Sequence, residues 1–519
     1  MQAKKKQSVF KVLFLGVIFS FIGIVVNLVG GIVLKIILAR LLGPEEFGLV
    51  NLSLAVLVLV SSLSLMGYQN GVTRFTAFYK GQGEKGKIKT TIKLVWKIVL
   101  FSSCLGGLIV YLFSGKIGVN IFHDPKLIPV LKILAFAIPL LALSSIFNAG
   151  LRGLKKIHLV VITDRIVWRI MPLVLISLLF VFFNLQLNDV AYSFLITVAM
   201  MLLFSAIFLY KEIIFYPDNL DRQTCLRDIT RYSWPVALFE IGNTLKGRTD
   251  TFLIAFFLGA YEVGIFAVAL TLSASLQIFL SSIIIIFNPV ASELYGENNI
   301  DEIGSIFSLV TKWLILLAFP ILLFLVFFSK TAITVLFGAS YENAAPVLAI
   351  LSICFFAKTA VGPSGTTLLS LGHSKINMRI SIAALMVSIL LCILLIPRFG
   401  LIGAAIATGF ATIFQQVSMY VMMKRFVKAR LFRKSLLLYA GYCIVLGGGF
   451  KMYLENFMNN LPGLSLFGVF FYFLALCGII ITRQLERDDL VLIERVRRKV
   501  KSKLIYFTKT LPVEDNTYE

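Results

Sequence analysis

Two stretches of the chain, LLGPEEFGL at 41–49 and FLGAYEVGI at 257–265, align without a gap at an offset of 216 residues. Two further pairs follow in the same order. PVLKILAF at 129–136 matches PVLAILSI at 346–353 at an offset of 217, and GLKKI at 153–157 matches GHSKI at 372–376 at an offset of 219. Three ordered matches at nearly one offset indicate an internal repeat.

The segments around these stretches are long apolar blocks. The 519 residues are 59% hydrophobic and only 14% charged, whereas a soluble chain carries about 25% charged residues. Each block is long enough for a helix to cross about 30 Å of hydrocarbon, which takes about 20 residues. The sequence predicts an all-α polytopic membrane protein with about fourteen spans, placed at 9–39, 47–67, 90–113, 129–151, 158–183, 190–210, 234–258, 263–288, 306–328, 346–371, 376–396, 400–423, 435–454 and 462–482.

The repeat offset covers six predicted spans, an even number, so the two copies should have the same orientation in the membrane. We expect residues 1–212 to form an N-terminal six-helix lobe and residues 213–432 a C-terminal one. Residues 433–519 would add two further helices and a basic tail. Two equivalent lobes facing each other would enclose a central cavity whose opening alternates as the lobes rock.

Basic residues are distributed unevenly between the loops. The chain has 49 Lys and Arg against 26 Asp and Glu, a formal net charge of +23. With the N-terminus inside, most of the basic residues fall in segments expected to face the cytoplasm, in agreement with the positive-inside rule. The sequence therefore predicts a multi-pass protein of the cell membrane with both termini cytoplasmic.

Three stretches resemble a known family. ARLLGPEEFG at 39–48, RTDTFLIAFFLGAYEVGIFAVA at 248–269 and NPVASELYGENN at 288–299 are similar to polysaccharide flippases of the multidrug/oligosaccharidyl-lipid/polysaccharide superfamily. The resemblance covers most of residues 10–425. It implies two six-helix lobes around a V-shaped cavity that moves undecaprenyl- or dolichyl-linked oligosaccharide across the membrane. Lipid II flippases carry Ser-Arg-x-x-Gly followed by a second Arg-Asp at the first turn, whereas this chain has Ala39 and Glu46, which favours the oligosaccharide branch.

The predicted seventh span, 234–258, contains four charged residues: Glu240, Lys246, Arg248 and Asp250. Charges inside a membrane span are costly and usually face a cavity or a partner. One interpretation is a self-neutralising Lys246–Asp250 pair one helical turn apart. The other is a polar cavity wall, in which Lys246 and Arg248 bind phosphate and Asp250 or Glu240 holds a coupling cation, Na⁺ or H⁺.

Lys358 is centred in the span at 346–371, and Gly362-Pro363 one turn later should kink that helix. A broken helix at the bilayer midplane is common at transporter binding sites, so Lys358 is a candidate substrate ligand. Lys35 and Arg40 lie toward the external end of the first span. We expect Lys35 to snorkel to the interface. For Arg40 the resemblance favours contact with a lipid pyrophosphate, which suits the bidentate geometry of arginine.

The expected function is translocation of polyprenyl-(pyro)phosphate-linked oligosaccharide, without covalent catalysis. Its alternatives are a cation-coupled multidrug exporter of the same superfamily and a membrane polysaccharide polymerase or glycosyltransferase. Three scattered histidines and six cysteines show no metal-binding spacing, so no metal or other cofactor is expected. Residues 68–89 and a tail helix around 493–504 are predicted to lie on the anionic inner leaflet. Polysaccharide assembly enzymes are candidate partners, and nucleic acid is not.

Overall fold

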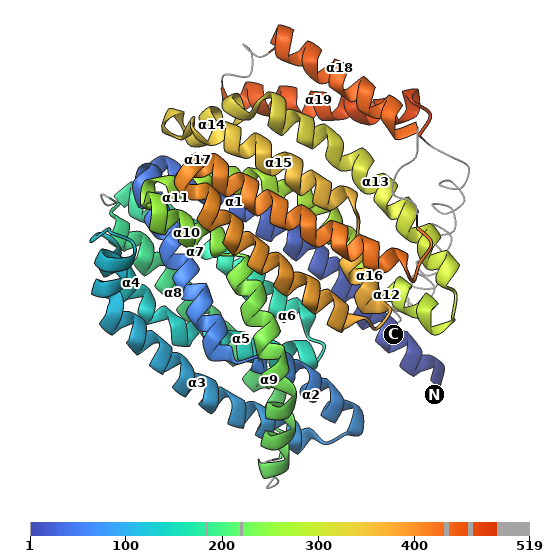
Figure 1. Cartoon of the computed structure of the whole chain (residues 1–519). Coiled ribbons are helices and arrows are strands. Elements are labelled where there is room, and N and C mark those ends of the chain that lie inside the picture. Colours follow the sequence, from blue (N-terminus) through green and yellow to red (C-terminus); the bar gives the residue numbers. More distant parts are fainter. Residues whose placement is uncertain (1, 183–184, 218–221, 430–434, 455–459, 485–519) are drawn as a thin grey trace, which may run out of the picture.

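The computed structural model describes residues 2–182, 185–217, 222–429, 435–454 and 460–484, and within these ranges all regular structure is helical (Figure 1). Side chains are described from Gly23 onward. The predicted tail helix around 493–504 lies outside the described residues. The first half of the chain consists of α1 (Gln2–Leu65), α2 (Tyr68–Gln82), α3 (Lys85–Gly115), η1 (Lys116–Ile121), α4 (Leu127–Ala135), α5 (Ala137–Gly153), α6 (Ile157–Val161), η2 (Ile162–Val167), α7 (Trp168–Phe182) and α8 (Leu187–Ile213).

The second half has a corresponding order of helices. It consists of α9 (Arg222–Lys246), α10 (Thr249–Leu258), α11 (Ala260–Ser273), η3 (Ala274–Gln277), α12 (Ile278–Gly296), α13 (Ile300–Phe327), α14 (Ser329–Phe337), η4 (Ala339–Tyr341), α15 (Ala344–Ala360), α16 (Ser364–Ser370) and α17 (Ser374–Lys424). Two last helices, α18 (Ser435–Leu454) and α19 (Leu461–Ile481), pack on α13 at the edge of the molecule (Figure 1).

Ten helical segments among the described residues are long and apolar enough to cross a membrane, or eleven if the bent pair α4–α5 counts as one span. The expected number was about fourteen. The difference arises partly because α1 and α17 each contain two of the expected spans, joined at Gly43 (φ 74°) and Gly400 (φ 56°). The two arms of α17 lie side by side, since Gln415 Nε2 donates to Ser381 Oγ at 3.0 Å. In addition, α9 is not among the ten, and α10 is a shorter apolar helix.

The repeated sequence stretches adopt the same backbone conformation. Gly43 (φ 74°, ψ 175°) and Gly259 (φ 94°, ψ 179°) both leave the helical region in a way that favours glycine. The turns after α5 and α16 have the same hydrogen bonds, from the amides of residues 154, 155 and 156 in one and 371, 372 and 373 in the other. This geometry pairs the two turns at an offset of 217. The offset of 219 expected for GLKKI and GHSKI was therefore wrong, because backbone conformation and not residue identity defines the equivalent positions.

The two halves meet most closely where α1 packs on α11. A Cβ on Gly48 would overlap the carbonyl oxygen of Ala260, and a Cβ on Gly264 would overlap the carbonyl oxygen of Pro44. Glycine is therefore required for the two backbones to approach this closely. We call this end of the molecule, which carries the turns at Gly43, His123, Gly259 and Gly338, the kink end.

Candidate functional site

The predicted seventh span is broken in its middle. Helix α9 ends at Lys246, and α10 begins at Thr249 after a turn in which the amide of Arg248 donates to the carbonyl of Leu245 at 3.0 Å. Lys246 and Asp250 are therefore not one turn apart on a continuous helix. No ion pair joins them among the described residues. The self-neutralising pair considered from the sequence is thus not formed, and both Lys246 and Arg248 flank the break.

Lys246 lies near Lys358. The two ammonium groups interact electrostatically, although they come from α9 and α15. Lys358 Nζ donates to Gln277 Oε1 at 2.5 Å, where η3 interrupts the path from α11 to α12. The expected kink is also present, since α15 ends at Ala360 and Gly362 (φ 71°) separates it from α16. Both lysine side chains are only partly buried.

Arg248 lies near basic residues of the first half. Lys35 of α1 interacts electrostatically with Arg248 and with Arg169 of α7. The carboxylate of Asp250 also interacts with Lys35. Lys35 Nζ donates to Thr271 Oγ1 of α11 at 2.9 Å. The sequence suggested that Lys35 snorkels to the interface. In the structure Lys35 instead connects the two halves through Thr271. Arg169 is held by Asn27, whose Oδ1 accepts from Arg169 Nε at 2.8 Å.

Together these residues form what we call the basic cluster: Lys35, Arg169, Lys246, Arg248 and Lys358. It has two parts. Lys35, Arg169 and Arg248 interact with one another, and the buried carboxylate of Asp250 acts on Lys35 and Arg248, whereas Lys246 and Lys358 form a second pair. All five retain partial exposure. Cations held close together repel one another, so the arrangement favours an anionic ligand. Chemically, it suits a phosphate or another multiply charged anion.

Sequence reasoning missed Arg169. A signal was present, because Arg165 and Arg169 lie one helical turn apart inside the apolar block at 158–183. The role of Lys35 had no such signal, since its partner Thr271 is 236 residues away in the chain.

Arg40, also a predicted substrate ligand, lies apart from the basic cluster at the kink end. Its Nε donates to the carbonyl of Leu336 at 2.8 Å, and its Nη2 donates to the carbonyl of Val335. Both carbonyls belong to the C-terminal turn of α14, where a cation is favoured by the helix dipole. In this conformation Arg40 joins α1 to α14.

Of the two predicted cation-coupling residues, only Asp250 lies near the basic cluster. Asp250 Oδ1 accepts from the backbone amide of Thr251 at 2.7 Å. Glu240 Oε1 accepts from Asn70 Nδ2 at 3.0 Å, in the contact between α9 and α2. Among the described residues no three His, Cys, Asp or Glu side chains are grouped in a way that could hold a metal ion.

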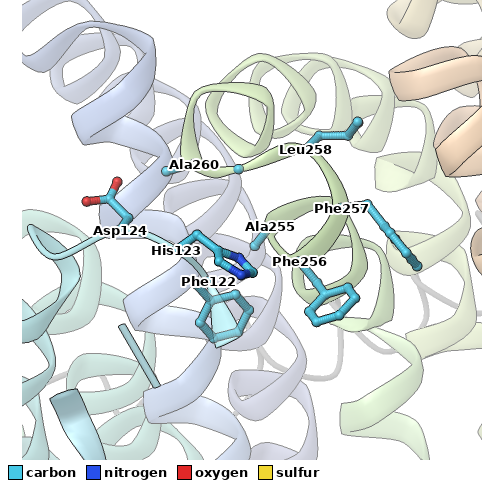
Figure 2. A pocket seen from close by; sticks show the side chains of 9 residues that line it. Phe122, His123, Asp124, Ala255, Phe256, Phe257, Leu258 and Ala260 are labelled. Carbon is cyan, nitrogen blue, oxygen red and sulfur yellow. The ribbon is translucent and has the colours of Figure 1, made fainter. Parts of the chain in front are cut away.

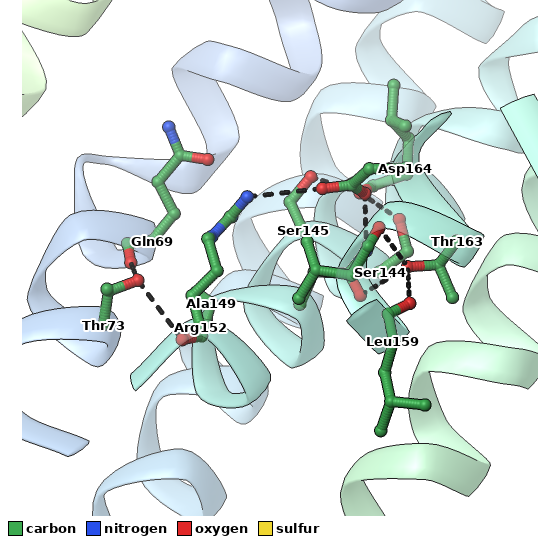
Figure 3. A network of polar contacts seen from close by, with 12 residues as sticks. Gln69, Thr73, Ser144, Ser145, Ala149, Arg152, Leu159, Thr163 and Asp164 are labelled. Atoms are coloured by element: carbon green, nitrogen blue, oxygen red, sulfur yellow. Dashed lines mark hydrogen bonds and ion pairs between the residues drawn. The ribbon is translucent and has the colours of Figure 1, made fainter. Parts of the chain in front are cut away.

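A second acid within an apolar block, Asp164, is partly exposed and belongs to a separate network in the first half (Figure 3). Asp164 lies in η2 and accepts from Asn148 Nδ2 at 2.5 Å and from Arg152 Nη1 at 3.3 Å. Thr163 Oγ1 donates to Asn148 Oδ1 at 2.8 Å. Arg152 balances the charge of Asp164, and Asn148 donates a hydrogen bond to its carboxylate. Because Asn148 and Arg152 belong to α5 and Asp164 belongs to η2, this network holds α5 against η2.

Helix α2 has the aromatic and basic pattern that predicted a helix on the membrane surface. Its buried residues Tyr68, Val72, Thr76 and Tyr79 pack toward α5 and α9, while Phe78 is 53% exposed. Lys80 Nζ donates to the carbonyl of Leu154 at 2.7 Å, and partial burial lowers the pKa of Lys80. One face of α2 is therefore committed to protein contacts, and the other remains free for lipid.

Comparison with known proteins identifies the family. Residues 37–346, well over half of the chain, match the family described as "Polysaccharide biosynthesis protein". The chain belongs to this family. It is 26% identical over 383 residues to a putative O-antigen transporter of Shigella flexneri, with 71% of this chain and 88% of that protein aligned. It is 25% identical over 183 residues to the probable low-salt glycan biosynthesis flippase Agl15 of Haloferax volcanii, covering 35% of this chain and 39% of that protein.

Another relative, an uncharacterised membrane protein of Methanocaldococcus jannaschii, is 24% identical over 341 residues, and the match covers 62% of this chain and 66% of that protein. Among solved structures, the lipid II flippase MurJ in an inward closed conformation superposes with a TM-score of 0.70 at 14% identity and covers 91% of this chain and 99% of its own. A multidrug resistance transporter of the MATE family, in an inward-facing conformation, gives 0.62 at 16% identity, covering 77% and 94%. This polysaccharide biosynthesis family member is thus a multi-pass membrane protein with the fold shared by MurJ and MATE transporters.

Proposed function

We propose that this chain translocates a polyprenyl-(pyro)phosphate-linked oligosaccharide across the cell membrane by alternating access, for the biosynthesis of surface polysaccharide or glycan. Residues 1–212 and 213–432 would act as the two lobes, with residues 433–519 appended. We count fourteen spans in this proposal. The arms of α1 and of α17 would each cross the membrane separately, and the pairs α4–α5 and α9–α10 would each form one span. Both termini would be cytoplasmic. Family membership and the transport functions named for two relatives support the proposal.

The basic cluster is the observation that carries the proposal. A diphosphate in a site of lowered dielectric needs fixed positive charge, and Arg offers bidentate contacts while Lys acts as a compact point charge. Lys35 and Arg169 come from the first half, and Lys246, Arg248 and Lys358 come from the second. A ligand held between them would contact both lobes and so relieve the repulsion across the interface. The polyprenyl tail would remain in the lipid.

In the same proposal, Asp250 or Glu240 would couple transport to Na⁺ or H⁺. The burial of Asp250 and its electrostatic interaction with Lys35 and Arg248 support this role. A cation that neutralised Asp250 would increase the positive charge available to the headgroup. Drug export is less well supported, because a site for cationic drugs should be lined mainly by acids and this one is lined mainly by bases.

The test compares Lys246→Ala and Lys358→Ala with Lys97→Ala, an exposed lysine of α3 that lies outside the basic cluster. A desolvated charge-assisted bond contributes about 1.5–3 kcal/mol, so each cluster variant should weaken headgroup binding about 10- to 100-fold. Membrane expression should be unchanged, because removing one of several clustered cations relieves repulsion. Wild-type polysaccharide export by both cluster variants would refute the proposed site. Loss of expression would show that these lysines stabilise the fold instead.

A further inference from the structure

A pocket at the kink end lies between the two halves of the chain. It has a volume of about 310 Å³ and is lined by the turn Phe122–Asp124, which follows η1, and by the segment Ala255–Ala260, which joins α10 to α11. This size is within the range of small-molecule sites. None of the residues of the basic cluster lines it, so it is a separate site (Figure 2).

Aromatic rings form one side of the pocket. Phe122 is fixed, since its ring stacks on Phe252 with 6.4 Å between centroids and is only 8% exposed. The backbone of His123 has a positive φ of 55°, which residues other than glycine rarely adopt. Its ring lies between Phe122 and Phe256 (Figure 2). Phe256 is 48% exposed, and the neighbouring Phe257, which also lines the pocket, is 36% exposed (Figure 2).

Backbone polar groups form another side. The last carbonyls of α10 and the first amides of α11 have no partners within their own helices, as at every helix end. The amide of Gly259 donates to the carbonyls of Ile254 and Ala255, both at 3.2 Å. The carbonyls of residues 256–258 therefore lie beyond the last hydrogen bonds of α10. The pocket thus combines ring faces with a rim of donors and acceptors, and Asp124 is its one acidic side chain.

The equivalent place in the other half of the repeat is filled. At the offset of 216, Phe256 corresponds to Arg40. The turn with a positive φ at His123, before α4, corresponds to the turn with a positive φ at Gly338, before α15. There Arg40 donates to the carbonyls of Leu336 and Val335, and Tyr341 Oη donates to the carbonyl of Ala39 at 2.9 Å. Two sites with the same backbone plan therefore differ in their side chains, one bridged by Arg40 and the other open beside Phe256. The fold alone does not require the open pocket.

We propose that this kink-end pocket binds a sugar ring of the translocated headgroup, a role that rests on the proposed function. A pyranose presents apolar C–H faces, which suit Phe122, His123 and Phe256, and a rim of hydroxyls, which suit Asp124 and the helix-end backbone groups. A phosphate does not fit beside Asp124, and the basic cluster provides for it elsewhere. The headgroup would thus have separate binding sites for its charged part and its sugar part. The sugar site lies at the kink end, where the two halves must part for release.

The test measures surface polysaccharide in cells whose export depends on the full-length chain, with Phe256→Ala, Phe256→Leu, Phe256→Tyr and the control Phe113→Ala. Phe113 of α3 is the matched control because it is 46% exposed, close to the 48% of Phe256, and does not line the pocket. Loss of one aromatic contact should reduce export about two- to ten-fold for Phe256→Ala and Phe256→Leu. Phe256→Tyr, which keeps the ring, should export normally, as should Phe113→Ala.

Each outcome decides the proposal. If Phe256→Leu exports like wild type, the ring is not a sugar platform and the pocket proposal is wrong. The same holds if Phe113→Ala is impaired as much as Phe256→Ala at equal expression. Failure of the proposed function is distinguishable, because it would leave Lys246→Ala and Lys358→Ala unimpaired. Failure of the pocket alone would leave those two variants defective and the Phe256 variants normal.

Discussion

The contact between Gly48 and Gly264 offers a direct test of how the kink end is closed. In Gly264→Ala the added methyl group would meet the carbonyl oxygen of Pro44, and in Gly48→Ala it would meet that of Ala260. Both obstacles are backbone atoms, so no side chain can move aside. Overpacking of this kind costs about 1–3 kcal/mol, and the greater helix preference of alanine offsets about 0.8–1 kcal/mol of it. A net cost of about 0.2–2 kcal/mol should shift the equilibrium between the closed and parted kink end about 1.4- to 30-fold toward the parted form.

The assay is the distance distribution between spin labels at Lys126→Cys and Lys330→Cys in the purified chain with its native cysteines replaced. The side chains of Lys126 and Lys330 are 59% and 66% exposed and belong to different halves. Their ion pairs with Glu45 and Glu342 are exposed and contribute little to stability. Either glycine variant should show a larger population at long distance. Gly115→Ala is the control, because a Cβ there meets no atom within 4 Å. If Gly264→Ala and Gly48→Ala gave the same distribution as Gly115→Ala, the close approach would not hold the kink end together.

Two further predictions concern Arg40 and the topology. Because the guanidinium of Arg40 bridges two carbonyls of α14, Arg40→Ala should lower the melting temperature of the purified chain, with a cost of about 1 kcal/mol or less since Arg40 is exposed. Unchanged melting together with lost export would instead return Arg40 to the role of substrate ligand. For topology, an impermeant thiol reagent added to intact cells should label Asn188→Cys and not Asn299→Cys, in a background without native cysteines. Equal labelling of both would overturn the proposed orientation from the fifth span onward.

Much of the fold could be predicted because the signals for it are local. Apolar blocks of about 20 residues identified the helices, and Gly43 and Gly259 marked two equivalent turns whose backbone only glycine adopts easily. Gly362-Pro363 correctly predicted the break between α15 and α16. The break at Gly247 and Arg248 was not foreseen, because a single glycine within an apolar span does not by itself end a helix. That break places Lys246 and Asp250 on different helices, and no ion pair joins them among the described residues.

What the sequence by itself determined is the membrane class, the internal repeat, the family resemblance and the presence of costly charges inside apolar segments. Each of these follows from composition or from spacing along the chain. Only the tertiary structure decided which charges meet. It brought Lys35 and Arg169 near Arg248 and Lys246 near Lys358, placed Arg40 on carbonyls 295 and 296 residues away, and left an open pocket beside Phe256. The physical reason is that hydropathy and helical periodicity act over a few turns of one helix, whereas the partner of a buried charge is fixed by how distant helices pack.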